Sequence, residues 1–96
     1  MDVNRWSGWN VVMQVNRDRL LAEIKTAGYS QRRLAREVSA KLEGRTFSKA
    51  AVSHLVADPP RQETVVEPVA EAIAAVLECE LAHLFKPKAK SLKGMA

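Results

Sequence analysis

The chain has 96 residues, with 15 Lys and Arg against 11 acidic residues and a formal net charge of +4. A chain of this length forms one domain at most and buries only a small core, so we expect no separate ligand-sensing domain within it. Apolar residues make up 47% of the chain but aromatic residues only 5%. This bias towards Ala, Val and Leu favours compact helices over a β-sandwich.

The cysteine content and the apolar segments limit the compartment and the chemistry. Cys79 is the one cysteine, so an internal disulfide or a Cys-based metal cage is excluded, which fits a reducing cytoplasm. The chain has no apolar run of membrane-span length, and its N-terminal residues lack the pattern of a signal peptide, so we expect neither a membrane span nor secretion. His54 and His83 lack a metal-ligand spacing, and Ser53 has no His and acid at a catalytic spacing. We therefore expect a cytoplasmic protein with no membrane contact, no enzyme activity and no metal or cofactor.

Charge is distributed unevenly along the chain. Residues 16–61 carry ten basic and five acidic side chains, a net charge of +5, whereas residues 62–85 carry five acidic side chains and no Lys or Arg, a net charge of −5. Four more lysines follow residue 85. Such a chain can orient in the field of a polyanion with its basic half inward. Ordinary solubility charge is the alternative explanation.

Residues 1–15 form an N-terminal arm whose structure the pattern leaves open. Trp9, Val11, Met13 and Val15 occupy alternate positions, which is close to a strand pattern, although the apolar residues of the arm also fit a helical spacing. A lone strand needs a partner, which could be a second copy across a two-fold axis or the helices of the same chain. Disorder is the third alternative.

Three helices are expected next, at residues 16–27, 30–42 and 48–57. Each begins at an N-cap residue, Asn or Ser, and each carries apolar residues at helical spacing. The three apolar faces are Leu20, Leu21, Ile24 and Ala27; Leu34, Ala35, Val38 and Leu42; and Val52, Leu55 and Val56. Gly28 ends the first helix, and the prolines at positions 59 and 60 end the third.

Two more helices complete the expected domain. The fourth begins between Thr64 and Pro68, either with Thr64 and Glu67 as a capping box or with Pro68 in the first turn. Its apolar face is Val69, Ile73, Val76 and Leu77. A short fifth helix at residues 81–85 ends before Pro87, and the rest of the chain has too little apolar content to fold alone.

These elements predict an all-α protein. It would consist of a compact five-helix domain at residues 16–85, the N-terminal arm at residues 1–15 with a possible strand, and a basic flexible tail at residues 86–96.

Several short motifs within residues 16–85 occur in a recognisable order. They are Ser30-Gln31, Leu34-Ala35, Phe47-Ser48, Val52-Ser53, Ile73-Ala74-Ala75-Val76-Leu77 and Leu81-Ala82-His83-Leu84-Phe85. In this order they resemble the lambda-repressor-like helix-turn-helix family, the Cro and repressor type of bacterial and phage regulators. Two departures stand out. Position 39 is Ser where the family has a turn glycine, with about five extra residues before Ser48, and Glu78-Cys79 replaces a Gly-Val pair.

The resemblance implies that the helix at residues 48–57 enters the DNA major groove. Lys49, Ala50 and His54 would face base edges, with Ala51 a weaker candidate; Lys can donate to guanine and Ala can touch a thymine methyl. Gln31 and Ser48 would hold phosphates, as would one or two of the three arginines at positions 32, 33 and 36. The candidate DNA-binding residues are Gln31, Arg32, Arg36, Arg45, Ser48, Lys49, Ala50, Ala51 and His54. For each of them, capping or a solvated side chain is the plainer alternative.

The expected function is sequence-specific DNA binding by a phage or prophage type of transcriptional regulator. One reading helix covers only a few base pairs, so we expect a homodimer on a palindromic operator and no small-molecule ligand. The protein would act in the cytoplasm of a bacterial cell or a phage-infected host. The alternative is the antitoxin of a toxin–antitoxin pair, which uses the same fold to bind DNA and to wrap a toxin.

Overall fold

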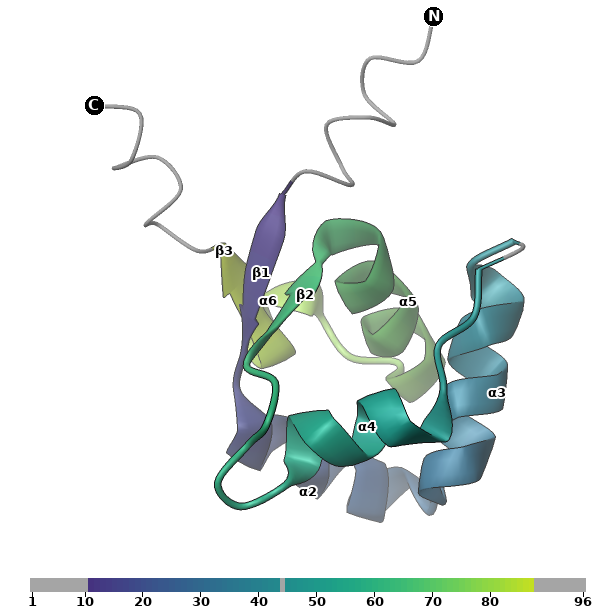
Figure 1. The fold of residues 1–96 in the computed structure, drawn as a ribbon, viewed down its shortest axis with the longest axis horizontal. Helices are drawn as coiled ribbons and strands as arrows, with labels where there is room; N and C mark the ends of the chain where they lie inside the picture. Colours follow the sequence, from purple (N-terminus) through teal and green to yellow (C-terminus); the bar gives the residue numbers. More distant parts are fainter. Residues whose placement is uncertain (1–10, 44, 88–96) are drawn as a thin grey trace, which may run out of the picture.

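Five helices and three short strands make up the part of the chain that the computed structural model describes, residues 11–43 and 45–87 (Figure 1). The helices are α2 (Arg17–Ala27), α3 (Gln31–Lys41), α4 (Lys49–Val56), α5 (Glu67–Leu77) and α6 (Leu81–Leu84). The strands are β1 (Val12–Val15), β2 (Thr64–Val66) and β3 (Phe85–Pro87).

The three strands form one antiparallel sheet, so the expectation of an all-α fold was wrong and the domain is a small compact α/β unit. The strand order is β2-β1-β3, and Met13 in the central strand lies opposite Val65 on one side and Pro87 on the other. The partners of β1 thus come from the same chain. The strand alternative for the N-terminal arm is confirmed at Val12–Val15. The strands β2 and β3 have three residues each, too few to show a clear alternation, and their pairing depends on segments far away in the sequence.

Side-chain caps begin the first three helices, as predicted. The side-chain oxygens of Asn16, Ser30 and Ser48 each accept a hydrogen bond of 3.1 Å from the backbone N–H three residues later. These bonds satisfy amide groups that have no partner within the helix. The starts of α2, α3 and α4 are therefore encoded locally.

The start of α5 follows the second of the two alternatives. Residues 64–66 form β2 and not a capping box, and the helix begins at Glu67 with Pro68 in its first turn. Proline suits this position because the amides of the first turn have no partner within the helix. At the other end of α5, Glu78 takes the left-handed conformation, φ 58°, as Gly28 does at the end of α2 with φ 75°.

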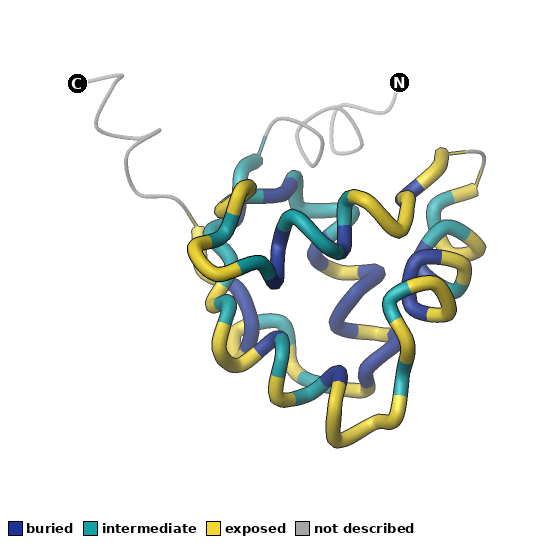
Figure 2. The backbone as a smooth tube through the Cα atoms, turned by 60° about the horizontal axis from the view of Figure 1, so that its bottom comes forward, coloured by how far each residue is buried: buried dark blue, intermediate teal, exposed yellow. Residues whose placement is uncertain are grey.

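A single apolar core fills the space between the helices and the inner face of the sheet. The sheet contributes Met13, Val65 and Phe85, which are 3%, 6% and 3% exposed. The largest fully buried side chains are Leu20, Leu34, Leu55, Ile73, Leu84, Val38 and Val52. Figure 2 shows the buried positions of the helices facing the middle of the molecule. Of the predicted apolar faces, Ala27 is the one exposed member, and the others are buried or half-buried.

Two further sequence predictions concern the ends of the chain and the absence of a membrane span. Trp9 and the lysines beyond Pro87 lie outside the described residues, so the predictions for them stay predictions. Within residues 11–43 and 45–87, none of the helices combines the length and the apolar character needed to cross a membrane.

Candidate nucleic-acid interface

Two hydrogen-bonded contacts hold α4 against α3. In the middle of α4, the Ser53 hydroxyl donates to the side-chain oxygen Oε1 of Gln31 at 2.5 Å. Just before α4, the Phe47 backbone N–H donates to Oγ of Ser39 at 2.8 Å, and the Ser39 hydroxyl donates to the Phe47 carbonyl at 3.1 Å. The connection between the helices is longer than the tight turn of the lambda-repressor-like family, but these contacts fix both its end and the helix that follows.

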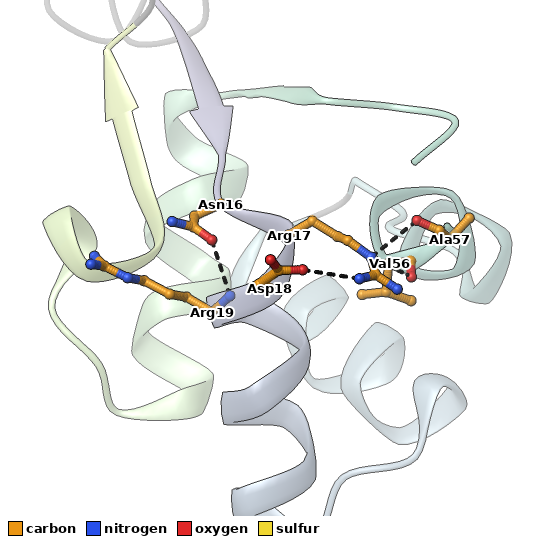
Figure 3. A network of polar contacts seen from close by, with 6 residues as sticks. All are labelled: Asn16, Arg17, Asp18, Arg19, Val56 and Ala57. Carbon is orange, nitrogen blue, oxygen red and sulfur yellow. Dashed lines mark hydrogen bonds and ion pairs between the residues drawn. The ribbon is translucent and has the colours of Figure 1, made fainter. Parts of the chain in front are cut away.

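The C-terminal end of α4 is held by α2 (Figure 3). Nε of Arg17 donates to the carbonyl oxygens of Val56 and Ala57, each at 3.1 Å, and its Nη1 lies 3.0 Å from Oδ1 of Asp18. The last carbonyls of a helix lack partners within the helix, and the guanidinium supplies donors to them. Arg17 therefore stabilises the position of α4, a role that its sequence pattern did not suggest.

The faces of α4 divide the predicted base-reading residues into two groups. Lys49 and Ala50 are exposed and His54 is half-buried. Because residues four apart lie one above the other on a helix, His54 shares a side with Ala50, and Lys49 shares the side of Ser53, which faces α3. Ala51 lies apart from them. It packs against the core and lines an apolar hollow whose other residues are Val12, Phe47, Gln62, Thr64, Val65, Val66 and Val69.

The three arginines of α3 also separate. With about 3.6 residues per turn, Arg32 and Arg36 lie beside the stripe of α3 that contacts α4, whereas Arg33 lies on the opposite side. Arg32 and Arg36 are exposed, and neither forms an ion pair with another residue of the described part of the chain. Nε of Arg33 instead lies 3.2 Å from Oε2 of Glu37, and its guanidinium carbon lies 4.7 Å from the ring centre of Tyr29.

The starts of α3 and α4 carry positive electrostatic potential. The first turns of both helices contain no acidic residue, whereas α2 has Asp18 and α5 has Glu67 there. A helix N-terminus carries about half a positive charge and attracts anions. Ser48 is exposed at this position in α4 while its Oγ caps the helix. Gln31 is half-buried at the start of α3.

Arg45 is not brought together with these groups. It lines a different hollow, beside α5, together with Lys41, Leu42, Glu43, Pro68, Glu71, Ala72 and Ala75. Lys41, which lines this hollow, is the last residue of α3, whereas Gln31 is the first. The two ends of α3 lie far apart along the helix (Figure 1). A backbone contact of Arg45 with DNA would therefore be separate from those of Arg32 and Arg36.

The remaining polar clusters stabilise the fold. Partial burial raises the pKa of the Cys79 thiol, and the neighbouring carboxylate of Glu23 raises it further, which agrees with a packed cysteine and not with a reactive thiolate. Glu23 also lies 3.1 Å from Nε2 of His83, joining α2 to α6. Among the described residues, no group of three or more His, Cys, Asp or Glu could hold a metal ion.

Comparisons of the chain with protein-family models, with curated proteins and with solved structures found no match in any of the three. The assignment of α3 and α4 as a nucleic-acid interface therefore depends on the geometry described above.

Proposed function

We propose that the protein is a sequence-specific DNA-binding regulator of transcription, of the Cro or repressor type, which reads the major groove with α4. The observation that carries this proposal is the placement of α4. The helix is fixed by α2 and α3, its first residues Lys49 and Ala50 are exposed, and its first turn, like that of α3, contains no acidic residue. The neighbouring α3 also carries Arg32 and Arg36, which form no ion pair within the described part of the chain.

Three side chains of α4, two of them exposed and one half-buried, supply the base-reading groups of this proposal. The major groove of B-DNA admits one α-helix, whose side chains reach the edges of the bases. Lys49 would donate to guanine O6 or N7, Ala50 would contact a thymine methyl, and His54 would reach a base or phosphate one turn later. Ala51 does not belong to this set, because it faces the apolar hollow.

The N-terminal turns and α3 supply the phosphate contacts. Oε1 of Gln31 accepts from Ser53, so the amide nitrogen of the same side chain remains as a donor. Arg32 and Arg36 add two exposed positive charges on the neighbouring side of α3. Ser48 adds a hydroxyl at the positive end of α4. Together these groups would fix the position of the duplex without reading its sequence.

The proposed partner is double-stranded DNA with a palindromic site, bound by a homodimer in the cytoplasm. A single eight-residue helix covers only a few base pairs, and a two-fold dimer doubles the sequence that is read. The two half-sites would then lie about one helical turn, ~34 Å, apart. No cofactor is needed for this activity.

Binding-site selection from random double-stranded DNA tests the proposal. We expect a palindromic motif to be enriched by the wild-type protein and by Lys86→Ala, which changes an exposed lysine of β3. The double variant Arg32→Gln/Arg36→Gln should enrich the same motif with lower affinity and with a salt dependence reduced by about two phosphate contacts. Recovery of no common motif by the wild-type protein would contradict the proposed function.

A further inference from the structure

The connection between α3 and α4 contains residues that face solvent and one residue, Phe47, that belongs to the core. Glu43, Arg45 and Thr46 are exposed. The backbone N–H of Leu42 donates to the Ser39 carbonyl at 3.0 Å, which ends α3 and does not bear on the start of α4. The backbone N–H of Arg45 donates to the Leu42 carbonyl at 3.3 Å, and Phe47 is 7% exposed and belongs to the core.

The Ser39 hydroxyl satisfies both backbone polar groups of Phe47. Packing of the Phe47 ring is non-directional and fixes the depth of the residue more strongly than its orientation. Two hydrogen bonds to the N–H and the carbonyl of one residue fix its orientation as well, because each depends on distance and angle. Ser48, the N-cap of α4, and Lys49 follow directly along the chain. A change in the Phe47 backbone is therefore carried directly into the first turn of α4.

We infer that Ser39 is a positioning residue for DNA reading: its hydroxyl sets where the first turn of α4 lies relative to the phosphate-binding side of α3. This inference rests on the proposed function. Ser39 contacts no DNA in this arrangement and acts through Phe47. Its effect should therefore appear in the discrimination between DNA sequences and not in general attraction to DNA.

The test compares Ser39→Ala with two matched variants. Ser39→Thr keeps a hydroxyl at the same position, and the double variant Ser39→Ala/Ala40→Ser moves the hydroxyl to the neighbouring, exposed position on α3. Alanine is the best helix former, so the helix itself should persist in Ser39→Ala, which far-UV circular dichroism checks. Ser39→Cys, with a weak donor and acceptor, replaces Ser39→Ala if the alanine variant does not fold.

Two quantities are measured for each variant. The first is the Kd for the selected DNA site and for unrelated duplex DNA of equal length. The second is the hydrogen-exchange rate of the Phe47 amide in the DNA-free protein, measured by NMR. For Ser39→Ala we expect about a tenfold weaker Kd on the selected site, a change within about twofold on unrelated DNA, and faster exchange at Phe47. Ser39→Thr should restore all three values towards wild type, and Ser39→Ala/Ala40→Ser should behave as Ser39→Ala does.

The outcomes separate this inference from the proposed function. An unchanged preference for the selected site in Ser39→Ala, with faster Phe47 exchange, would overturn the positioning role while leaving DNA binding intact. Unchanged Phe47 exchange in Ser39→Ala would overturn the contact itself. If the wild-type protein prefers no sequence, the proposed function fails and the inference about reading fails with it, whatever the exchange rates are.

Discussion

At the scale of single residues, Lys49 carries most of the proposed sequence reading. It is exposed in the first turn of α4, where the helix dipole disfavours a cation. Its charge therefore does not stabilise the helix in the free protein. Hydrogen bonds from Lys49 to the guanine acceptors of a bound DNA duplex would offset this unfavourable interaction with the helix dipole. Ala50 offers one methyl group, and His54 is half-buried. Sequence preference should therefore respond strongly to this one side chain.

We expect Lys49→Ala to weaken binding to the selected site by about 1–3 kcal/mol and to relax the preference at one base position of each half-site. Titrations with the selected site and with single-base variants of it measure both effects. Lys86→Ala removes an exposed lysine from β3 and should leave the preference unchanged. A wild-type base profile in Lys49→Ala would exclude a base-reading role for this lysine.

Tyr29 reports on the polar cluster at the side of α3 that faces away from α4. Partial burial raises the pKa of its phenol, and the hydrogen bond to Glu37 at 3.2 Å, together with the charge of that carboxylate, raises the pKa further. The nearby Arg33 lowers the pKa. A negative neighbour disfavours the tyrosinate and a positive neighbour favours it, so the two contributions have opposite signs.

Removing each neighbour should therefore shift the titration of Tyr29 in opposite directions. Glu37→Gln should lower the pKa of Tyr29, and Arg33→Gln should raise it. Absorbance titration of the tyrosinate measures this directly, since the chain contains one tyrosine. Shifts of the same sign in both variants would contradict the arrangement of Tyr29, Arg33 and Glu37.

The candidate site was only partly predictable from residue types. Lys49 and Ala50 of α4 and Arg32 and Arg36 of α3 are exposed, in agreement with the amphipathic pattern. The apolar face of a helix defines its exposed face as well. The side on which Ala51 lies could not be assigned, since alanine is compatible with either face. The contact between Ser39 and Phe47 joins residues eight apart across an irregular connection, and local spacing does not predict it. The one indication in the sequence was Ser39, at the position where the lambda-repressor-like family has a turn glycine.

At the scale of elements, α2 and α5 end in the same way with different residues. Both have a left-handed residue after the last turn, whose N–H donates back to two carbonyls of the helix. Gly28 takes this conformation without strain, and nothing lies within 4 Å of the position of an added Cβ. Glu78 is strained in the same conformation, and its negative charge lies at the negative end of the helix dipole.

Exchanging the residue type at these two ends should change stability in opposite directions. We expect Gly28→Ala to lower the free energy of unfolding by about 1 kcal/mol, because a Cβ disfavours the left-handed conformation. Glu78→Gly should raise it by about 0.5 kcal/mol, because strain and an unfavourable charge are removed. Urea unfolding followed by circular dichroism measures both. A stabilising Gly28→Ala would contradict the left-handed end of α2.

The elements themselves were predictable to different degrees. Helices with a capping side chain and an apolar stripe are encoded within a dozen neighbouring residues, and α2, α3 and α4 begin at their predicted caps. The strands are encoded by pairing between remote segments. Residues 64–66 fit a capping motif as well as a strand, and the presence of β1 beside them decides between the two.

At the scale of the whole molecule, the sheet makes residues 12–15 part of the core instead of an arm beside it. Met13 is 3% exposed in the central strand, whereas its neighbour Gln14 is half-buried on the other face of the sheet. The core is small, so a single buried side chain of this size is a large share of its apolar contacts. The stability of the domain should therefore depend on β1.

We expect Met13→Ala to lower the free energy of unfolding by about 2–4 kcal/mol, through lost burial and the cavity that remains. Gln14→Ala is the matched control and should change it by less than about 0.5 kcal/mol. The midpoint of urea unfolding gives both values. Equal effects of the two substitutions would mean that β1 does not pack as described.

The strand order also has a consequence for synthesis. Met13 is made early, yet its sheet partners Val65 and Pro87 lie 52 and 74 positions later. The helices that bear the proposed DNA contacts can form from local sequence as they leave the ribosome, but the sheet cannot close until β3 has emerged. A nascent chain stopped anywhere before residue 85 would leave one edge of β1 unpaired, so the emergence of β3 is the step at which this domain can first reach its folded form.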